Sequence, residues 1–481
     1  MTESTRHKVA TNLAWRFAER VGARLVQFGT AIVLARMLGP DDYGTVALIT
    51  VFIAIVQVFV DSGLGNALIQ KKNADDIDFS TVFYTNIVFC AILYGAIFLF
   101  APLIASFYNS PNLANLTRVL GLTVLVSGVK NVQQAYVSRK MIFRKFFFST
   151  LAGTIGAAIV SIVMAYNGFG VWALVAQQVF NVTIDTLVLW VTVKWRPKLV
   201  FSFERLKGLF SYGWKLLVSG VLNAVSDNLR QLVIGKMYSS VDLAFYNRGR
   251  QFPDLVVNNI NSSIDSVLLP TMSSVQEDKK RVKQMTRRSI KVSVFLMAPL
   301  MMGLAFTATN VIKVLLTDAW LPAVPYVAIF SVAFLFWPIH TANLNAIKAV
   351  GRSDIFLKLE VIKQVVNVAV LVVALNFGVL AIAISMVILG VFCQIINAWP
   401  NRKLIGYGYM EQLRDIAPGL LLAVMMGLAV FPLNYVGFPP IIGLGLQVIL
   451  GSVIYIAGAK ITKLDSYEYI LNMIKSKIAK K

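Results

Sequence analysis

The chain has 481 residues, of which 57% are hydrophobic and only 14% are charged, and its mean hydropathy is +0.70. Soluble globular proteins are typically about 45–50% apolar and about 25% charged, so this composition excludes that class. The net charge of +22 would suggest a nucleic-acid partner in a soluble protein. In a membrane protein, basic residues hold cytoplasmic loops in place, so we expect no nucleic acid.

Fourteen segments are apolar and long enough to cross a membrane, which takes about 20 residues. In chain order they are 12–38, 43–69, 80–107, 113–136, 148–167, 170–193, 208–238, 241–272, 289–316, 322–349, 358–377, 379–399, 416–436 and 440–462. The sequence therefore predicts an all-α polytopic membrane protein with about 14 transmembrane helices.

The connections between these segments alternate in charge. With the N-terminus inside, the inner connections carry Lys and Arg, whereas outer turns such as "GPDD", "YNSPN" and "YNGFG" carry neither. The positive-inside rule then places both termini in the cytoplasm. The last residues, 464–481, combine lysines with apolar positions and indicate a basic amphipathic helix on the inner leaflet.

A shift of 200 residues aligns the chain with itself. "AIVLARM" at 31–37 lies on "QLVIGKM" at 231–237, and Asp42 falls on Asp242. The first two helices thus correspond to the seventh and eighth. We predict an N-lobe at 1–200 and a C-lobe at 201–400, each of six helices and related by a pseudo-two-fold axis along the membrane normal. Helices 13 and 14 follow at 401–463, and the tail occupies 464–481. Such repeats are typical of transporters whose substrate lies between the lobes.

Polar residues recur every three or four positions on several helices, which places them on one helical face. The residues that we expect to line a cavity or to bind a coupling ion, H+ or Na+, are Glu19, Gln57, Asp61, Asn223, Asp227, Asn247, Asp254 and Asn258. Lipid cannot satisfy such groups, so they must face another helix or a wet cavity. The alternative interpretation is local pairing, for example of Arg250 with Asp254.

Arginines accompany these stripes. The predicted substrate-binding set is Arg16, Arg20, Arg24, Arg230, Arg248 and Arg250. The guanidinium group presents a planar fork that matches phosphate or carboxylate oxygens. A cationic cavity favours an anionic substrate and disfavours a lipophilic cation. Glu19 would then moderate the charge of Arg20 and Arg24.

Motifs of enzymes and metal sites are not found. The sequence contains no Walker loop, no HExxH, no nucleophile elbow and no Cys/His cluster, and its two cysteines, Cys90 and Cys393, lie in apolar runs. We therefore expect no catalytic residue, no metal and no cofactor beyond a coupling ion, and we predict that the protein is not an enzyme.

Four motifs carry a family resemblance: "ARMLGPDDYGTVALI" at 35–49, "DSGLGNALIQ" at 61–70, "FAPLIASFY" at 100–108 and "FYNRG" at 245–249. The chain resembles the polysaccharide transport family, the Wzx-type flippases of the MOP superfamily, and its colanic-acid-exporter-like branch. The resemblance implies two six-helix lobes around a central cationic cavity in the bacterial inner membrane. It also implies flipping of an undecaprenyl-diphosphate-linked oligosaccharide, the repeat unit of an exopolysaccharide, capsule or O-antigen, by alternating access.

The implied partners are the lipid-linked anionic glycan, inner-membrane lipids and the polysaccharide polymerase machinery. Two other functions stay open: a multidrug or cation antiporter of the same superfamily, and a membrane-embedded polysaccharide polymerase or glycosyltransferase. For the flippase, the topology predicts an inner basic site at Arg16, Arg20 and Arg24, and an outer one at Arg248 and Arg250.

Overall fold

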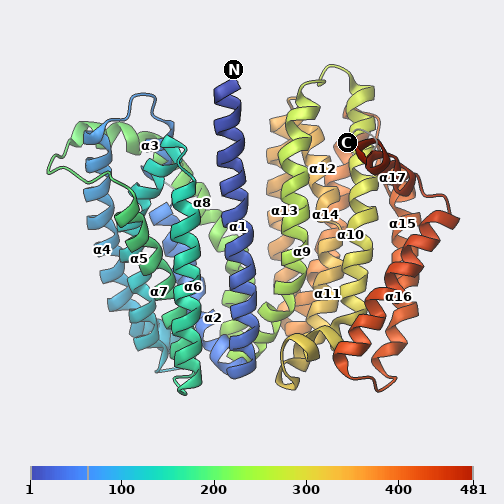
Figure 1. Ribbon diagram of the computed structural model, residues 1–481, viewed down its shortest axis with the longest axis horizontal. Coiled ribbons are helices and arrows are strands. Elements are labelled where there is room, and N and C mark those ends of the chain that lie inside the picture. Colours follow the sequence, from blue (N-terminus) through green and yellow to red (C-terminus); the bar gives the residue numbers. More distant parts are fainter. Residues whose placement is uncertain (1–2, 62–63, 479–481) are drawn as a thin grey trace. The chain divides into compact units, whose positions relative to one another are not determined.

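The computed structural model describes residues 3–61 and 64–478, apart from the side chains of 3–10, 13, 61, 211–213, 215–216, 263, 474 and 477–478. The described part of the chain is mostly helical and contains no strand (Figure 1). It separates into two compact units, 1–244 and 245–481.

Unit 1 is built from eight helices and the start of a ninth within its described residues. These are α1 (Glu3–Met37), α2 (Pro40–Asp61), α3 (Leu64–Gln70), α4 (Asp76–Phe107), α5 (Leu113–Lys140), α6 (Arg144–Tyr166), α7 (Val171–Thr192), α8 (Phe203–Met237) and α9 (Ser240–Ser273).

Unit 2 contains the rest of α9 and the helices that follow. They are α10 (Lys279–Leu315), the 3-10 turn η1 (Asp318–Ala323), α11 (Val324–Leu335), α12 (Trp337–Ala349), α13 (Ser353–Ala374), η2 (Leu375–Phe377), α14 (Val379–Leu404), α15 (Tyr409–Val430), η3 (Phe431–Asn434), α16 (Pro440–Ile461) and α17 (Asp465–Ile478).

Each of the fourteen predicted segments coincides with a helix or a pair of helices. Segment 43–69 covers α2 and α3, between which residues 62 and 63 lie outside the described chain. Segment 322–349 is divided into α11 and α12, and this division falls where Pro338 occupies the first turn of α12. Proline has no N–H to donate, so it starts a helix readily and interrupts one that is already running. The predicted tail helix is α17.

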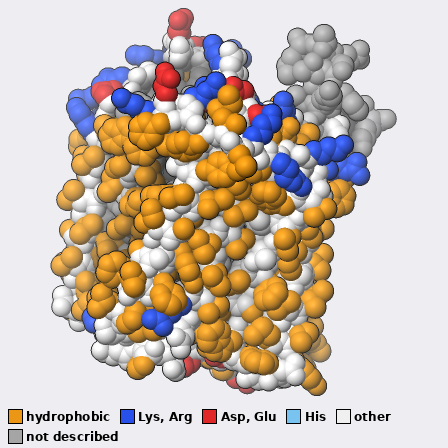
Figure 2. Space-filling model, turned by 90° about the vertical axis from the view of Figure 1, so that its left-hand side faces the viewer, with side chains coloured by type: hydrophobic (Ala, Val, Ile, Leu, Met, Phe, Trp, Pro, Cys, Tyr) orange, Lys and Arg blue, Asp and Glu red, His pale blue; other side chains and the backbone are white. Residues whose placement is uncertain are grey.

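The protein is a multi-pass membrane protein. Ten helical runs of the described chain are long and apolar enough to span a membrane, and α1, α8, α9 and α13 are not among them. These four helices carry the charged and polar stripes that lower their hydropathy. Hydrophobic side chains cover a broad band on the face of the molecule in Figure 2, and most Lys and Arg side chains there gather beyond one edge of that band. The total of fourteen crossings, the cytoplasmic termini and the lobe boundaries at 200 and 400 stay predictions.

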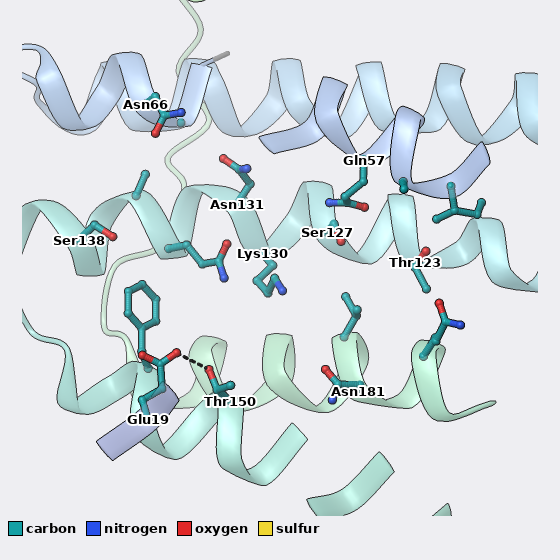
Figure 3. Close-up of a pocket in the computed structure, with 18 of the residues that line it drawn as sticks. Glu19, Gln57, Asn66, Thr123, Ser127, Lys130, Asn131, Ser138, Thr150 and Asn181 are labelled. Carbon is teal, nitrogen blue, oxygen red and sulfur yellow. Dashed lines mark hydrogen bonds between the residues drawn. The ribbon is translucent and has the colours of Figure 1, made fainter. Parts of the chain in front are cut away.

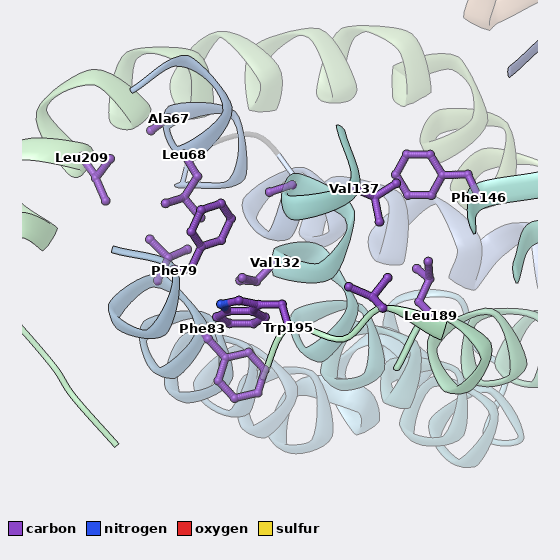
Figure 4. Close-up of a cluster of buried hydrophobic side chains, with 13 residues drawn as sticks. Ala67, Leu68, Phe79, Phe83, Val132, Val137, Phe146, Leu189, Trp195 and Leu209 are labelled. Carbon is purple, nitrogen blue, oxygen red and sulfur yellow. The ribbon is translucent and has the colours of Figure 1, made fainter. Parts of the chain in front are cut away.

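A cluster of buried hydrophobic side chains holds one end of unit 1 together (Figure 4). Trp195 follows α7 and packs on Phe79 and Phe83 of α4, with ring centroids 5.7 and 6.3 Å away. Its carbonyl oxygen accepts a hydrogen bond of 3.1 Å from the buried Gln133 amide of α5. The cluster fixes α4, α5 and α7 against each other and so positions the helices around the pocket described below.

Ion pairs close the connection between α3 and α4. Asp75 caps α4, and its pKa is lowered by the backbone N–H of Asp78 and by Arg205, whose guanidinium donates to Asp75 Oδ1 at 2.6 Å. Lys71 Nζ contacts the fully buried Asp78 carboxylate at 2.7 Å. Arg139 donates to the carbonyls of Leu68 and Lys72, which compensates the otherwise unpaired C-terminal end of α3.

The helix boundaries repeat at the shift of 200 residues. Helices α1 and α8 end at Met37 and Met237, and α2 and α9 begin at Pro40 and Ser240. The turns before α2 and α9 contain the same side-chain hydrogen bond. Gly39 N donates to Asp42 Oδ2 at 3.3 Å, and Ser239 N donates to Asp242 Oδ2 at 3.3 Å. Equivalent caps at equivalent positions support the internal repeat.

The two repeated turns also touch within unit 1. Ser240 Oγ donates to Asp41 Oδ1 at 2.9 Å. A Cβ atom added at Gly44 would lie only 2.0 Å from the Ser240 carbonyl oxygen, which is backbone and has little freedom to move. Glycine is therefore required at position 44 because the Ser240 backbone approaches it closely, and not because of its own φ angle.

Substituting Gly44 with Ala is expected to lower the free energy of unfolding by about 1–3 kcal/mol, because the two turns must separate. The measurement is thermal unfolding of the purified protein in detergent. Gly95→Ala in α4 is the matched control, since a Cβ there meets nothing within 4 Å. Equal stability of the two variants would contradict the close approach.

Candidate functional site

Unit 1 contains a polar pocket of about 780 Å³ among α1, α2, α3, α5, α6 and α7 (Figure 3). Its polar lining comprises Arg16, Glu19, Gln27, Thr50, Gln57, Asn66, Thr123, Ser127, Lys130, Asn131, Gln134, Ser138, Thr150, Gln177, Gln178 and Asn181. We call this the amide pocket, because eight of these side chains are amides, five carry hydroxyls and three are charged. Its size lies in the range of about 300–1,000 Å³ that is usual for ligand sites.

The local sequence explains why these side chains converge. On α5, the lining positions Thr123, Ser127, Lys130, Gln134 and Ser138 are separated by three or four residues and share one face of the helix. Gln177 and Asn181 do the same on α7. Since the opposite faces of these helices are largely apolar, the bundle turns the polar faces toward one another.

Arg16 and Glu19 form an ion pair at one end of the amide pocket. Arg16 Nη1 lies 2.6 Å from Glu19 Oε2. Thr150 Oγ1 donates to Glu19 Oε1 at 3.2 Å, as the dashed line in Figure 3 marks. The Arg16 guanidinium also stacks over the Phe146 ring, 4.7 Å from its centroid. The two charges neutralise each other, and Thr150 and Phe146 hold them in place, so the pocket carries little net charge at this end.

A second ion pair supports the middle of the pocket. Lys130 Nζ lies 3.2 Å from Asp185 Oδ2, and the side chains of both residues are largely buried. Asn131 beside it is also buried, and its amide donates to the Val60 carbonyl at 2.9 Å, whereas its Oδ1 atom accepts no hydrogen bond from the described residues. The pair neutralises Lys130, so amides and hydroxyls dominate the chemistry of the pocket.

These groups offer many donors and acceptors and little net charge. An amide both donates and accepts hydrogen bonds, as does a hydroxyl. The arrangement suits a hydroxyl-rich ligand such as a sugar. Among the described residues, no group of three or more His, Cys, Asp or Glu is placed to hold a metal ion.

The amide pocket brings together only some of the predicted site residues. Arg16, Glu19 and Gln57 line it. Arg20 and Arg24 are exposed and do not line it. Glu19 pairs with Arg16, which lies three residues before it on the same helical face. The expectation that Glu19 also moderates the charge of Arg20 and Arg24 stays a prediction. The side chain of Asp61 lies outside the described residues.

The predicted residues of α8 differ in burial. Arg230 is buried, with 7% of its surface exposed, whereas Asn223 and Asp227 are exposed. On α9, Asn247 is half-buried and Asn258 is exposed. Their predicted roles in binding stay predictions.

The arginines of α9 are engaged inside unit 2. Arg248 is buried, donates to Gln251 Oε1 at 2.7 Å and stacks over Trp320 at 4.9 Å. Arg250 Nε donates to Asp254 Oδ2 at 3.1 Å. The local pairing considered for Arg250 and Asp254 is therefore present.

Sequence reasoning missed most of the α5 contribution, including Lys130, Asn131 and Gln134. The signal was available, because Thr123, Ser127, Lys130, Gln134 and Ser138 form a stripe with the same spacing as those recognised on other helices. Lys130 and Asp185 are far apart in the sequence, so their pairing follows only from the packing of α5 against α7.

Membrane-length helices around a hydrophilic pocket define a polytopic membrane transporter. The chain belongs to the polysaccharide biosynthesis protein family, which matches residues 33–325. It is 25% identical to the succinoglycan biosynthesis transport protein ExoT of Rhizobium meliloti, over 99% of this chain and 98% of ExoT. It is 23% identical to the lipopolysaccharide biosynthesis protein WzxC of Escherichia coli, over 82% of this chain and 80% of WzxC.

Two solved structures have a similar fold. The lipid II flippase MurJ in an inward closed conformation superposes with a TM-score of 0.73 at 15% identity, covering 94% of this chain and 98% of MurJ. An inward-facing multidrug resistance MATE transporter of the MOP superfamily superposes with a TM-score of 0.62 at 16% identity, covering 80% of this chain and 94% of the transporter. The predicted all-α polytopic fold and the predicted family are confirmed.

Replacing Lys130 with Met is expected to destabilise unit 1 by about 3–5 kcal/mol, because it leaves the Asp185 carboxylate buried without its partner. The double variant Lys130→Met, Asp185→Asn should regain most of that loss, since no uncompensated charge remains. Unfolding of the purified proteins, followed by circular dichroism, measures both. Additive losses in the double variant would contradict the coupling.

Proposed function

We propose that the protein is a flippase that moves an undecaprenyl-diphosphate-linked oligosaccharide across the bacterial inner membrane by alternating access. The observation that carries this proposal is the amide pocket, which places sixteen polar side chains among helices of membrane length. The glycan would be the repeat unit of an exopolysaccharide, capsule or O-antigen. The polysaccharide polymerase machinery that would use the flipped unit is a partner in the same proposal.

The physical argument concerns the sugar head. Moving a hydroxyl from water into hydrocarbon without a hydrogen bond costs roughly 4–8 kcal/mol, so an oligosaccharide does not cross lipid unaided. Amides and hydroxyls along the route replace water at the sugar, while the polyprenyl tail stays in lipid. The names of ExoT and WzxC associate those relatives with polysaccharide biosynthesis, which supports a glycan substrate here.

The diphosphate requires cationic partners. We propose that Arg20 and Arg24 receive it near the cytoplasmic side and that Arg248 and Arg250 receive it near the outer side, with Arg230 in the outer half of α8. Arginine forks match phosphate oxygens, and each such charge-assisted hydrogen bond is stronger than a neutral one. The pairing of Arg250 with Asp254 would then be exchanged for the diphosphate when substrate arrives.

Two other functions are less well supported. The multidrug antiporter has a similar fold, but the arginines of α1 and α9 disfavour a cationic substrate. A polymerase or glycosyltransferase usually needs acidic residues on a larger segment outside the membrane, and the outer turns predicted here are short. Transport of the lipid-linked glycan is therefore the better proposal.

Replacing Gln57 or Asn181 with Leu should reduce flipping at least tenfold, because each change removes amide groups from the pocket without adding charge. The measurement is protection of a fluorescent lipid-linked oligosaccharide in reconstituted vesicles, together with accumulation of lipid-linked intermediates in a complemented deletion strain. Thr183→Val on α7 is the control, because Thr183 does not line the pocket and bonds the Val179 carbonyl of its own helix. Normal flux in both Leu variants would refute a glycan route through the amide pocket.

The coupling ion is a separate proposal. Asp254 is engaged by Arg250 at 3.1 Å, which favours a structural partner over an H+ or Na+ ligand at this carboxylate. Asp254→Asn is therefore expected to slow flux while leaving its response to imposed pH and Na+ gradients unchanged. A gradient response that disappears in Asp254→Asn but persists in Arg250→Gln would assign the ion to Asp254.

A further inference from the structure

A second polar pocket, also of about 780 Å³, lies at one end of unit 2. The end of α9, the start of α10 and the start of α17 line it (Figure 1). Its polar lining is Thr271, Ser274, Arg281, Gln284, Arg287, Arg288, Lys291, Asp465, Ser466 and Tyr469. Four of these residues are basic and one is acidic, so we call it the basic pocket.

The acidic residues nearby are already engaged. Arg287 makes two hydrogen bonds of 2.7 Å with the Asp415 carboxylate. Lys291 Nζ lies 2.5 Å from Asp465 Oδ2. These ion pairs neutralise Arg287 and Lys291, two of the four basic residues. They also neutralise Asp465, the one carboxylate that lines the pocket.

Arg281 and Arg288 differ from the other two cations. Within the described side chains, neither makes an ion pair with an acidic residue. The Arg288 guanidinium stacks over the Tyr469 ring of α17, 4.3 Å from its centroid, which orients the fork without neutralising it. Arg281, Gln284, Arg288 and Lys291 follow one face of α10 at intervals of three and four residues.

The N-terminal ends of α10 and α17 are already occupied by carboxylates of the chain. Asp278 Oδ1 caps α10 by accepting a hydrogen bond of 3.0 Å from Arg281 N, and Asp465, which Lys291 engages, begins α17. The guanidinium groups of Arg281 and Arg288 therefore remain as the receptor for a phosphate-bearing anion.

The surroundings select a lipid as the source of that phosphate. α17 exposes 36% of Tyr469 and 43% of Met473, and Ile461 at the end of α16 is 79% exposed. A helix with apolar residues on one face and lysines on the other lies at the headgroup level of a membrane. The topology predicted from the charge pattern of the connections places this end of unit 2 at the cytoplasmic leaflet, where anionic lipids attract basic clusters.

We propose that the basic pocket binds the phosphate headgroup of an anionic phospholipid of the inner leaflet, through Arg281 and Arg288. The bound headgroup joins the start of α10 to α17 and thereby fastens the C-terminal helix to unit 2. This site is independent of the proposed glycan route, because it shares no residue with the amide pocket or with the arginines that are proposed to receive the diphosphate.

The test uses the purified full-length protein in detergent, with phosphatidylglycerol, phosphatidylcholine and inorganic pyrophosphate as separate probes. Thermal unfolding and native mass spectrometry report binding. Phosphatidylglycerol should raise the unfolding temperature of the wild type, and the variant Arg281→Gln, Arg288→Gln should weaken that binding at least tenfold. Arg402→Gln, Lys403→Gln at the end of α14 removes the same charge outside the pocket and should retain wild-type binding.

A third, conservative variant separates loss of binding from loss of folding. Arg288→Lys keeps the charge and loses the planar fork, so its affinity for phosphatidylglycerol should fall between the wild type and the double variant. Equal weakening in the pocket and α14 variants would overturn the proposal, because the attraction would then be diffuse. Equal stabilisation by phosphatidylcholine, or by pyrophosphate alone, would overturn it as well.

Discussion

The constraint on which the structure depends is that hydrocarbon satisfies no polar group. Unit 2 meets it with a buried network: the Asn343 amide donates to Gln412 Oε1 at 2.9 Å, while Gln412 and Asn401 both donate to Asn343 Oδ1 at 2.8 Å. Unit 1 meets the same constraint differently, by leaving many of its polar side chains around a pocket. Side chains that bond one another across helices hold those helices together, whereas an open pocket is available to a ligand.

The internal repeat preserves the turns before α2 and α9 but not the side chains that follow them. The turns before α2 and α9 carry the same carboxylate cap, 200 residues apart. The helices that follow then diverge, because α2 directs Gln57 into the amide pocket while α9 retains its arginines in contacts within unit 2. Shared backbone geometry with different side-chain chemistry allows a duplicated bundle to acquire distinct functions in its two halves.

The amide pocket and the basic pocket illustrate two kinds of polar site in one membrane protein. In the first, ion pairs neutralise the charges, and amides and hydroxyls remain for a ligand. In the second, Arg287 and Lys291 pair with Asp415 and Asp465, and the guanidinium groups of Arg281 and Arg288 remain for an anion. What each pocket offers is therefore set by which charges its own neighbours have already neutralised, rather than by its composition alone.

The sequence by itself determined the fold class, the helical segments and the family, because hydropathy and local spacing are properties of neighbouring residues. It also determined that α1, α2, α8 and α9 carry polar faces. Only the tertiary structure decided the partners: Glu19 with Arg16 and Thr150, and Lys130 with Asp185. The last pair joins residues 55 positions apart. Helical periodicity predicts which side chains share a face of one helix. The residues that this face contacts depend on how the helices pack against each other.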